Sequence, residues 1–373
     1  MKYYIISGEA SGDMHGANLV SEIKRRDKHA EFRGWGGDKM EAEGVEINKH
    51  YRELAFMGFA EVLMNLRTIL NNLKKCKADI LAYNPDGVIL IDYPGFNLRI
   101  AEFLHENGIK VFYYISPQIW AWKQNRVHKI KKVVDKMFVI LPFEKPFYKK
   151  FNIEVDFVGN PLLDEIHKFK ESYKSEDFRA NNKLSDKPII ALLPGSRTQE
   201  IKTKLPVMLS VVEAYKDYQF VIAGAPSQEE TIYKEIIGNQ NNVSIVFGKT
   251  YPLLLNSHAG LITSGTATLE TALFKVPQVV CYKANPISYR IAKRLVKIKF
   301  ISLVNLIMDK EIVRELIQHE LTTTNVTSEL GKLLEGKDRE NLLADYDELI
   351  IKLGGVGASA NTAEHIVNYL DSK

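Results

Sequence analysis

Short apolar runs alternate along the chain with longer segments in which apolar residues recur every three or four positions. In the first half, the apolar runs lie at 3–6, 87–91, 110–115, 136–141 and 155–158. Helical periodicity is clear between the first two of these runs, at Val62, Leu66, Ile69 and Leu73. Runs that are apolar throughout and separated by helices predict a parallel sheet covered on both faces.

A polar stretch from Lys168 to Lys187 interrupts this alternation, and a second set of apolar runs follows it at 189–193, 218–223, 243–246, 259–263 and 278–282. Because 373 residues exceed what one ordinary core accommodates, we predict an α/β protein with two Rossmann-like parallel-sheet domains that face a central cleft. The expected parts are a first domain at 1–167, a linker at 168–187, a second domain at 188–345, and a C-terminal helix at 346–373. Packing of that helix back on the first domain is one option.

The composition narrows the class of protein. Lys and Arg outnumber Asp and Glu by only 50 to 46, which is no signature of nucleic-acid binding. Cys76 and Cys281 lie far apart, so we expect a reducing compartment without disulfides, and no Cys or His cluster has metal-ligand spacing. The first apolar run is too short for a signal peptide, and none reaches the roughly 18 residues of a membrane span. We therefore expect a cytoplasmic protein that does not cross a membrane.

The first predicted strand ends in Ser7-Gly8-Glu9-Ala10-Ser11-Gly12-Asp13, where a helix is expected to begin. Gly8 and Gly12 would let the backbone approach a ligand closely, and the start of the helix offers free N–H groups to an anion. The dinucleotide fingerprint is absent, and Glu9 would repel a pyrophosphate but could accept hydrogen bonds from sugar hydroxyls. The alternative is a tight turn with Asp13 as a helix cap.

Two loops in the second half have the pattern of a phosphate site. Gly195 permits close backbone approach after the run 189–193, and Arg197 supplies a planar cation suited to phosphate. Ser264-Gly265-Thr266 follows the run 259–263, where small residues at a helix start form an anion nest. Glu270 lies about one helical turn further, and its carboxylate could accept hydrogen bonds from both hydroxyls of a ribose. Turn chemistry explains each loop alone, but together they predict a nucleoside diphosphate site.

Asp92 follows the run 87–91 and precedes Tyr93-Pro94-Gly95. A carboxylate at the end of a strand, facing a cleft, is well placed to take a proton from a hydroxyl. An Asp that merely starts a turn is the alternative, because Asp is common before Pro-Gly.

In this order along the chain, several stretches resemble the lipid-A-disaccharide synthase family. They are Ser7–Asp13, Met57-Gly58 with Glu61-Val62, Ile91–Asn97, Ser116–Trp122, Leu193–Arg197, Ser264–Glu270, and the block from Tyr289–Val296 through Ser302–Leu306. The resemblance implies the GT-B fold and an inverting glycosyltransferase. Such an enzyme joins UDP-2,3-diacylglucosamine to the 6-hydroxyl of 2,3-diacylglucosamine 1-phosphate (lipid X). The products are the β(1→6) lipid A disaccharide 1-phosphate and UDP.

The resemblance also implies residue roles, with Asp92 as the catalytic base. The implied substrate-binding residues are Gly8, Glu9, Ser11, Gly12, Asp13 and Asn305. The implied UDP-binding residues are Gly195, Ser196, Arg197, Ser264, Gly265, Thr266 and Glu270. The chain departs from the family pattern at Val304, where Pro is usual, at Asn160, where His is commoner, and at Thr198-Gln199.

The expected chemistry needs neither a metal nor a cofactor. One displacement at the anomeric carbon converts an α-linked UDP-sugar into a β-product, so a single base such as Asp92 suffices. Arg197 and the nest at Ser264 can stabilise the charge on the leaving UDP.

Lipid substrates suggest peripheral association with the cytoplasmic face of the inner membrane. An amphipathic segment with this potential combines Phe56, Met57, Phe59, Leu63, Leu66 and Ile69 with Lys74, Lys75 and Lys77. A basic stripe at Arg290–Lys299 and a second group of cations after Trp120 could attract anionic headgroups. The alternative is that the apolar residues pack on the sheet and the lysines form a solvated face. The expected partners are the two lipid substrates and the membrane surface, without nucleic acid, and self-association stays open.

Two other functions remain open at this point. One is a different UDP-sugar enzyme on the same scaffold, such as a non-hydrolysing 2-epimerase or a glycosyltransferase with another lipid acceptor. The other is a non-catalytic lipid-binding protein of the same fold.

Overall fold

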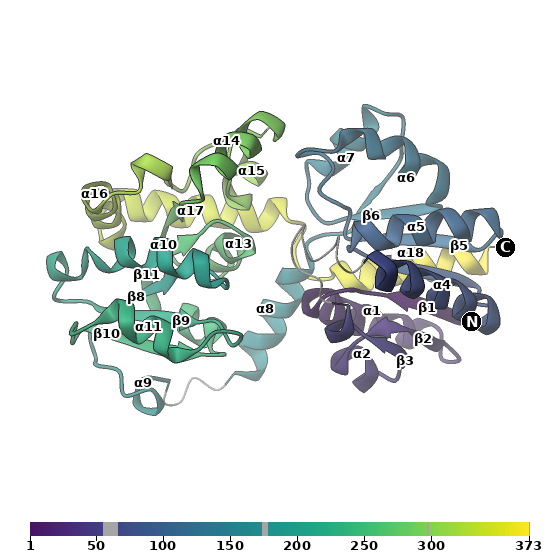
Figure 1. The fold of residues 1–373 in the computed structure, drawn as a ribbon, viewed down its shortest axis with the longest axis horizontal. Coiled ribbons are helices and arrows are strands. Elements are labelled where there is room, and N and C mark those ends of the chain that lie inside the picture. The colour runs from purple at the N-terminus through teal and green to yellow at the C-terminus, as the bar shows by residue number, and fades with distance from the viewer. Residues whose placement is uncertain (55–65, 174–177, 297, 373) are drawn as a thin grey trace. The chain divides into compact units, whose positions relative to one another are not determined.

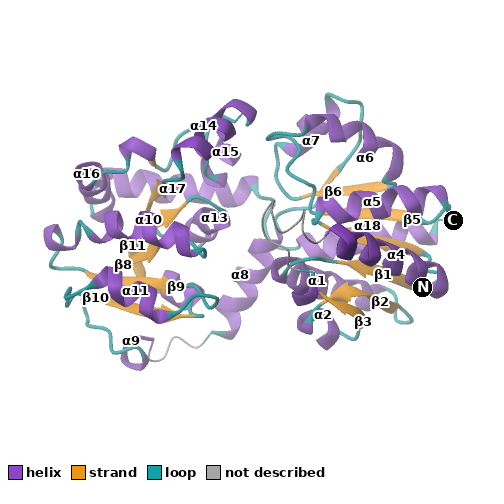
Figure 2. Ribbon diagram, in the orientation of Figure 1, coloured by secondary structure: helices purple, strands orange, loops and turns teal. Residues whose placement is uncertain are grey.

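A computed structural model describes residues 1–54, 66–173, 178–296 and 298–372. The chain forms two compact units, one of Met1–Asp164 with Leu353–Lys373 and one of Glu165–Lys352 (Figure 1). Each unit holds a parallel β-sheet with helices packed around it (Figure 2). The predicted α/β class with two Rossmann-like parallel-sheet domains is therefore confirmed.

The first unit is built on a seven-stranded sheet in the order β3-β2-β1-β4-β5-β6-β7, in which every neighbouring pair is parallel. Its strands are β1 Lys2–Ile6, β2 Glu31–Gly36, β3 Glu46–His50, β4 Gly87–Ile91, β5 Lys110–Tyr114, β6 Lys136–Val139 and β7 Asp156–Phe157. Its described helices are α1 Ala10–Arg26, α2 Asp38–Ala42, α4 Leu66–Tyr83, α5 Pro94–Glu106, α6 Val127–Val133, α7 Glu144–Lys149 and α18 Ala358–Asp371.

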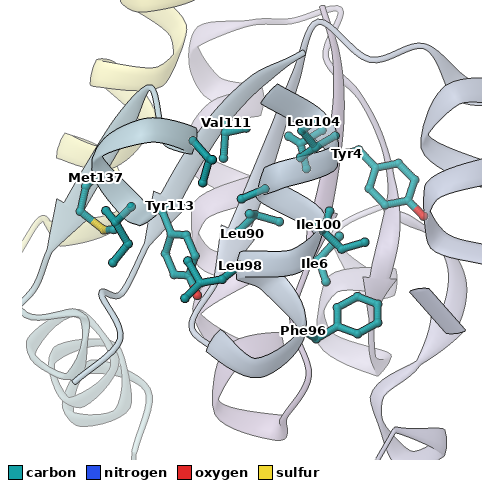
Figure 3. Close-up of a cluster of buried hydrophobic side chains, with 14 of the residues drawn as sticks. Tyr4, Ile6, Leu90, Phe96, Leu98, Ile100, Leu104, Val111, Tyr113 and Met137 are labelled. Atoms are coloured by element: carbon teal, nitrogen blue, oxygen red, sulfur yellow. The ribbon is translucent and has the colours of Figure 1, made fainter. Parts of the chain in front are cut away.

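Alternate residues of the central strands of this unit pack into opposite layers. Tyr4 and Ile6 of β1 join Leu90 of β4 in a buried cluster that α5 covers (Figure 3). Tyr3 and Ile5, one position along, pack in the other layer with residues of α1 and α18. Because both faces of these strands are buried, the sequence there is apolar throughout instead of alternating.

The second unit has a six-stranded parallel sheet in the order β10-β9-β8-β11-β12-β13. Its strands are β8 Ile189–Leu193, β9 Gln219–Gly224, β10 Val243–Phe247, β11 Ser257–Thr263, β12 Gln278–Tyr282 and β13 Glu315–Ile317. Its helices are α9 Phe178–Asn181, α10 Thr198–Leu209, α11 Glu230–Ile237, α12 Thr250–Leu255, α13 Thr266–Leu273, α14 Pro286–Leu295, α15 Leu303–Met308, α16 Thr323–Leu334 and α17 Lys337–Lys352.

The units divide at different positions from those expected. The predicted start of the linker at residue 168 falls within α8, Pro161–Ser172, and the predicted boundary at 345–346 falls within α17. The polar composition after Lys168 therefore marks in part the exposed face of a helix, which sequence alone does not distinguish from a linker.

The last helix, α18, belongs to the first unit and packs against α1. The carboxylate of Asp164 accepts hydrogen bonds from the amides of Gly357, Ala358 and Ser359, at 2.5, 3.3 and 3.0 Å. These amides have no partners within the helix, so the carboxylate satisfies them and opposes the positive end of the helix dipole.

Candidate active site

One cavity of the second unit, about 410 Å³ in volume, lies at the carboxyl ends of β8, β9 and β11. All seven residues predicted to bind UDP line it: Gly195, Ser196, Arg197, Ser264, Gly265, Thr266 and Glu270. Loops about 70 residues apart in sequence thus meet at one edge of one sheet, as the geometry of parallel strands requires.

The loop after β8 is shaped to bring its backbone close to a partner. Gly195 has φ +115°, and a Cβ there would lie 2.3 Å from a carboxylate oxygen of Glu200, so only glycine fits. The Ser196 amide donates to that carboxylate at 3.2 Å. Gln228 donates to the Ser196 carbonyl at 3.1 Å and fixes the loop from its other side. Arg197 is exposed, and no described residue forms an ion pair with its guanidinium, which leaves that group available to a ligand.

The loop after β11 leads directly into the N-terminus of α13. Gly265, with φ +153°, is the residue before the first turn, and its carbonyl accepts a hydrogen bond of 2.8 Å from the Thr268 hydroxyl. The Ser264 hydroxyl donates to the Ile301 carbonyl at 2.8 Å, which ties the loop to the segment before α15. Gly265 and Thr266 are exposed and line the cavity at this helix N-terminus, where backbone amides lack partners within the helix.

Glu270 lies one turn inside α13, where the Tyr251 hydroxyl donates to its Oε1 at 3.2 Å. Burial raises the pKa of the Glu270 carboxyl, and the Tyr251 hydrogen bond partly opposes the shift. The bond holds one oxygen in place and leaves the carboxylate with further acceptor capacity.

Sequence reasoning missed part of this cavity. Its wall also includes Ala223, Gly224, Ala225 and Pro226 after β9, together with Thr250 at the start of α12. The signal was present, because Gly-Ala-Pro directly follows a predicted strand and so lies at the same sheet edge.

Asn305 does not offer a free polar group. Its side chain is 0% exposed, and its amide nitrogen donates to the Val313 carbonyl and to Glu315, at 2.8 and 2.9 Å. Its oxygen accepts from the amides of Ile312 and Val313, at 2.8 and 3.0 Å. The predicted contact of Asn305 with substrate therefore needs correction, because this side chain holds the segment 302–315 together instead.

In the first unit, Asp92 follows β4 in an unusual backbone conformation. Asp92 and Tyr93 have φ +42° and +47°, which lie in the left-handed region that residues other than glycine rarely adopt. The Asp92 carbonyl accepts hydrogen bonds from Asn97 Nδ2 at 2.8 Å and from the Tyr113 hydroxyl at 2.6 Å. Two side chains of the surrounding structure thus hold the turn that presents this carboxylate.

The Asp92 carboxylate reaches solvent but has protein on most sides. This crowding raises its pKa to about 6, and the negative charge of Glu9 adds to the shift. The charge of Glu9 in the first loop therefore acts on Asp92, the residue after β4, which their separation in sequence did not reveal.

The two glycines of the first loop make close contacts within the protein. A Cβ at Gly8 would lie 2.5 Å from the ring of Tyr93, and one at Gly12 would lie 2.9 Å from Ser7 Cβ. Contacts within the protein, with Tyr93 and Ser7, are therefore enough to require glycine at both positions. Ser11 is exposed at the start of α1.

Asp13 has a structural role. Its side chain is 3% exposed and accepts hydrogen bonds from the amides of Gly37, Lys39 and Met40, at 2.7, 3.1 and 3.1 Å. It therefore caps α2 from a neighbouring helix, and neither the predicted substrate contact nor the alternative of a cap on its own helix matches this arrangement.

The residues expected at a membrane are only partly described. Phe56, Met57, Phe59 and Leu63 lie outside the described residues. Lys74 and Lys75 of α4 are exposed, and so is Leu70, at 55%. Arg290, Lys293 and Arg294 of α14 are exposed. None of the helices in the described ranges is long and apolar enough to cross a bilayer.

Comparison with known proteins agrees with the geometry. The model of the Lipid-A-disaccharide synthetase family matches residues 3–368. The chain is 39% identical over 366 residues to "Lipid-A-disaccharide synthase" of Syntrophus aciditrophicus, an alignment that covers 96% of this chain and 95% of the relative.

Solved structures agree on the fold. A UDP-GlcNAc 2-epimerase from Neisseria meningitidis, bound to UDP-GlcNAc, has a TM-score of 0.67 at 15% identity, over 100% of both chains. The calicheamicin glycosyltransferase CalG4 has a TM-score of 0.65 at 16% identity, over 99% of this chain and 98% of its own. At such identities the likeness establishes the GT-B type of fold and no more.

Proposed function

The chain belongs to the Lipid-A-disaccharide synthetase family and is therefore a glycosyltransferase, and from this premise we propose how its own residues perform the transfer. The donor is UDP-2,3-diacylglucosamine and the acceptor is lipid X, with the β(1→6) disaccharide 1-phosphate and UDP as products. The observation that carries the proposal is the single cavity that all seven residues assigned to UDP line.

The second unit binds the donor nucleotide. Arg197 pairs with the diphosphate, and the amides at Ser264-Gly265-Thr266 donate to its oxygens at the start of α13. Glu270 accepts hydrogen bonds from the ribose hydroxyls, while Tyr251 holds its other oxygen. These groups also stabilise the negative charge that UDP gains as it leaves.

Asp92 of the first unit is the general base. It removes the proton from the 6-hydroxyl of the acceptor as that oxygen attacks the anomeric carbon, opposite the departing UDP. A pKa of about 6 leaves Asp92 ionised at neutral pH yet more basic than an ordinary aspartate, which suits proton removal. Burial is the main cause of this raised pKa, and the negative charge of Glu9 adds to it, so Glu9 acts here through Asp92.

We assign structural roles to two residues of the predicted substrate set. Asp13 anchors α2, and Asn305 orders the segment that receives the Ser264 hydroxyl at Ile301. Asn305 therefore stabilises the segment that holds the loop at Ser264, and it does not contact the nucleotide itself.

The lipid substrates call for peripheral binding at the cytoplasmic face of the inner membrane. Support comes from the exposed cations of α14, Arg290, Lys293 and Arg294, and from exposed Leu70 on α4. Anionic lipid headgroups would attract these cations, and Leu70 would contribute apolar contact with the lipid.

The proposal is tested by UDP release in a coupled assay with both substrates. The expected result is release that requires lipid X. A 2-epimerase needs no acceptor, so conversion of the UDP-sugar without lipid X would refute transfer. Binding of lipid X without any UDP release would indicate a non-catalytic protein instead.

A further inference from the structure

Lys204 is a buried lysine on α10, and its side chain is only 3% exposed. Its neighbours on the buried side of the helix, Ile201, Leu205 and Met208, belong to the apolar core of the second unit. Burying an ammonium among such side chains is unfavourable unless its charge has a use or a partner.

The partners of this ammonium are weak for a buried charge. Its Nζ donates a hydrogen bond to the hydroxyl of Thr263, the last residue of β11. Among the described residues, no carboxylate forms an ion pair with it. Glu200, one turn earlier on α10, turns its carboxylate to the Ser196 amide instead. Desolvation lowers the pKa of Lys204, and Glu200 only partly opposes the shift.

The position of Lys204 relates it to the cavity described above. Thr263 and Glu200 both line that cavity, together with Arg197 and Ser264. Lys204 therefore lies directly behind the wall on which the two phosphate-binding loops meet. A charge in this poorly solvated layer acts more strongly on the cavity than an equal charge exposed to water.

We propose that Lys204 is a second, buried cation for the diphosphate of the donor nucleotide, acting through the cavity wall at Thr263 while Arg197 acts from the exposed side. The inference rests on the proposed UDP site. It explains why a buried ammonium lacks a carboxylate partner within the described protein: the anion that balances it arrives with the ligand. Since UDP gains negative charge as it leaves, the same cation favours the transition state.

The test compares Lys204→Met with Lys202→Met, by calorimetric titration with uridine, UMP and UDP. Both changes remove one positive charge from α10 and add the same side chain, but Lys202 is exposed. Lys204→Met should weaken UDP binding by roughly tenfold or more and UMP binding less, and leave uridine binding unchanged. Lys202→Met should leave all three affinities close to those of the parent, because solvent screens its charge.

Thermal melting separates this role from a structural one. Methionine has a similar length and no charge to bury, so Lys204→Met should melt at the same temperature as the parent or higher. A lower melting temperature with equal loss of uridine and UDP affinity would show that Lys204 only supports the fold. Lys204→Gln repeats the test if the Met variant does not fold, and failure of both to fold would likewise overturn the inference.

The outcomes also distinguish this inference from the proposed function. If the parent binds no UDP, or if Arg197→Ala and Glu270→Ala bind it unchanged, the UDP site itself is wrong. If those two variants lose affinity and Lys204→Met does not, only the role of Lys204 is refuted.

Discussion

Asn97 Nδ2 donates a hydrogen bond of 2.8 Å to the backbone carbonyl of Asp92, and the Tyr113 hydroxyl donates to the same oxygen at 2.6 Å. Both donors are fully buried. They hold a left-handed backbone turn at Asp92 that would otherwise be unfavourable, so the position of the proposed base depends on them.

Removal of this support should reduce turnover more than nucleotide binding. Tyr113→Phe keeps the ring and deletes only the hydroxyl, and Asn97→Ala deletes the second donor. Since misplacement of a reacting group by about 1 Å can cost roughly 10²-fold, we expect kcat to fall by about 10- to 100-fold in each variant. UDP affinity, measured by calorimetry, should stay within about twofold because the residues proposed to bind UDP lie in the other unit. A parallel loss of UDP affinity would contradict a role limited to positioning Asp92.

Replacement of the base itself should be more severe. Asp92→Asn keeps the shape of the side chain but cannot accept the proton, and loss of a positioned base costs roughly 10²–10⁴-fold in rate. Single-turnover kinetics with both substrates provide the measurement, and UDP titration provides the control for folding. Turnover near that of the parent would remove Asp92 from the mechanism.

The pH dependence of kcat/KM should report the charge of Asp92. The base acts in its ionised form, so activity should be full above its pKa of about 6 and decline as pH falls through that value. Glu9→Gln removes a negative charge that raises this pKa, which should move the acidic limb of the profile to lower pH. Profiles recorded between about pH 5 and pH 8 for parent and variant test the shift. An unchanged limb, or a shift to higher pH, would contradict the coupling.

Nucleotide binding should depend on Arg197 and Glu270. Charge-assisted hydrogen bonds contribute about 1.5–3 kcal/mol each, so Arg197→Ala and Glu270→Ala should weaken UDP binding by roughly one to two orders of magnitude. Uridine separates the two roles, because Glu270→Ala should weaken uridine binding as well and Arg197→Ala should not. If Glu270→Ala binds uridine as the parent does, the ribose contacts lie elsewhere.

Membrane association should depend on the cations of α14. Replacing Arg290, Lys293 and Arg294 with Gln should reduce co-sedimentation with anionic vesicles, since each cation near such a surface contributes about 1 kcal/mol. Lys202, Lys216 and Lys234, also exposed, provide a control that removes the same charge from other helices or loops. High salt should release the parent in part. An equal loss of co-sedimentation in the α14 variant and in the control variant would show that binding depends on net charge and not on α14.

The fold was predictable wherever burial determined the sequence. Strands with both faces covered, such as β4 and β5, are unbroken apolar runs and were predicted from them. β2 reads Glu-Phe-Arg-Gly-Trp-Gly and β3 reads Glu-Ile-Asn-Lys-His, so neither has such a run, and both were missed. β3 is the edge strand and is partly exposed, which permits polar residues. β2 lies between β3 and β1, and it lacks an apolar run because glycine occupies two of its buried positions, Gly34 and Gly36.

The candidate site was predictable to a similar, limited extent. The rule that ligands bind beyond the carboxyl ends of parallel strands identified Asp92 and the two loops that line the cavity. The rule did not reveal that Asp13 caps α2, or that Asn305 binds the backbone of the segment that follows Asn305 in the chain. A buried polar residue that binds its own backbone and one that binds a ligand have the same sequence pattern, and only tertiary contacts separate them.

The most direct test of the account is the identity of the product from purified protein, UDP-2,3-diacylglucosamine and lipid X. We expect mass spectrometry to show a disaccharide monophosphate formed in equal amount to UDP, with a proton NMR spectrum that gives a β(1→6) linkage, and no such product with Asp92→Asn. An α-linked product, or hydrolysis or epimerisation of the donor without a disaccharide, would contradict an inverting transfer with Asp92 as its base.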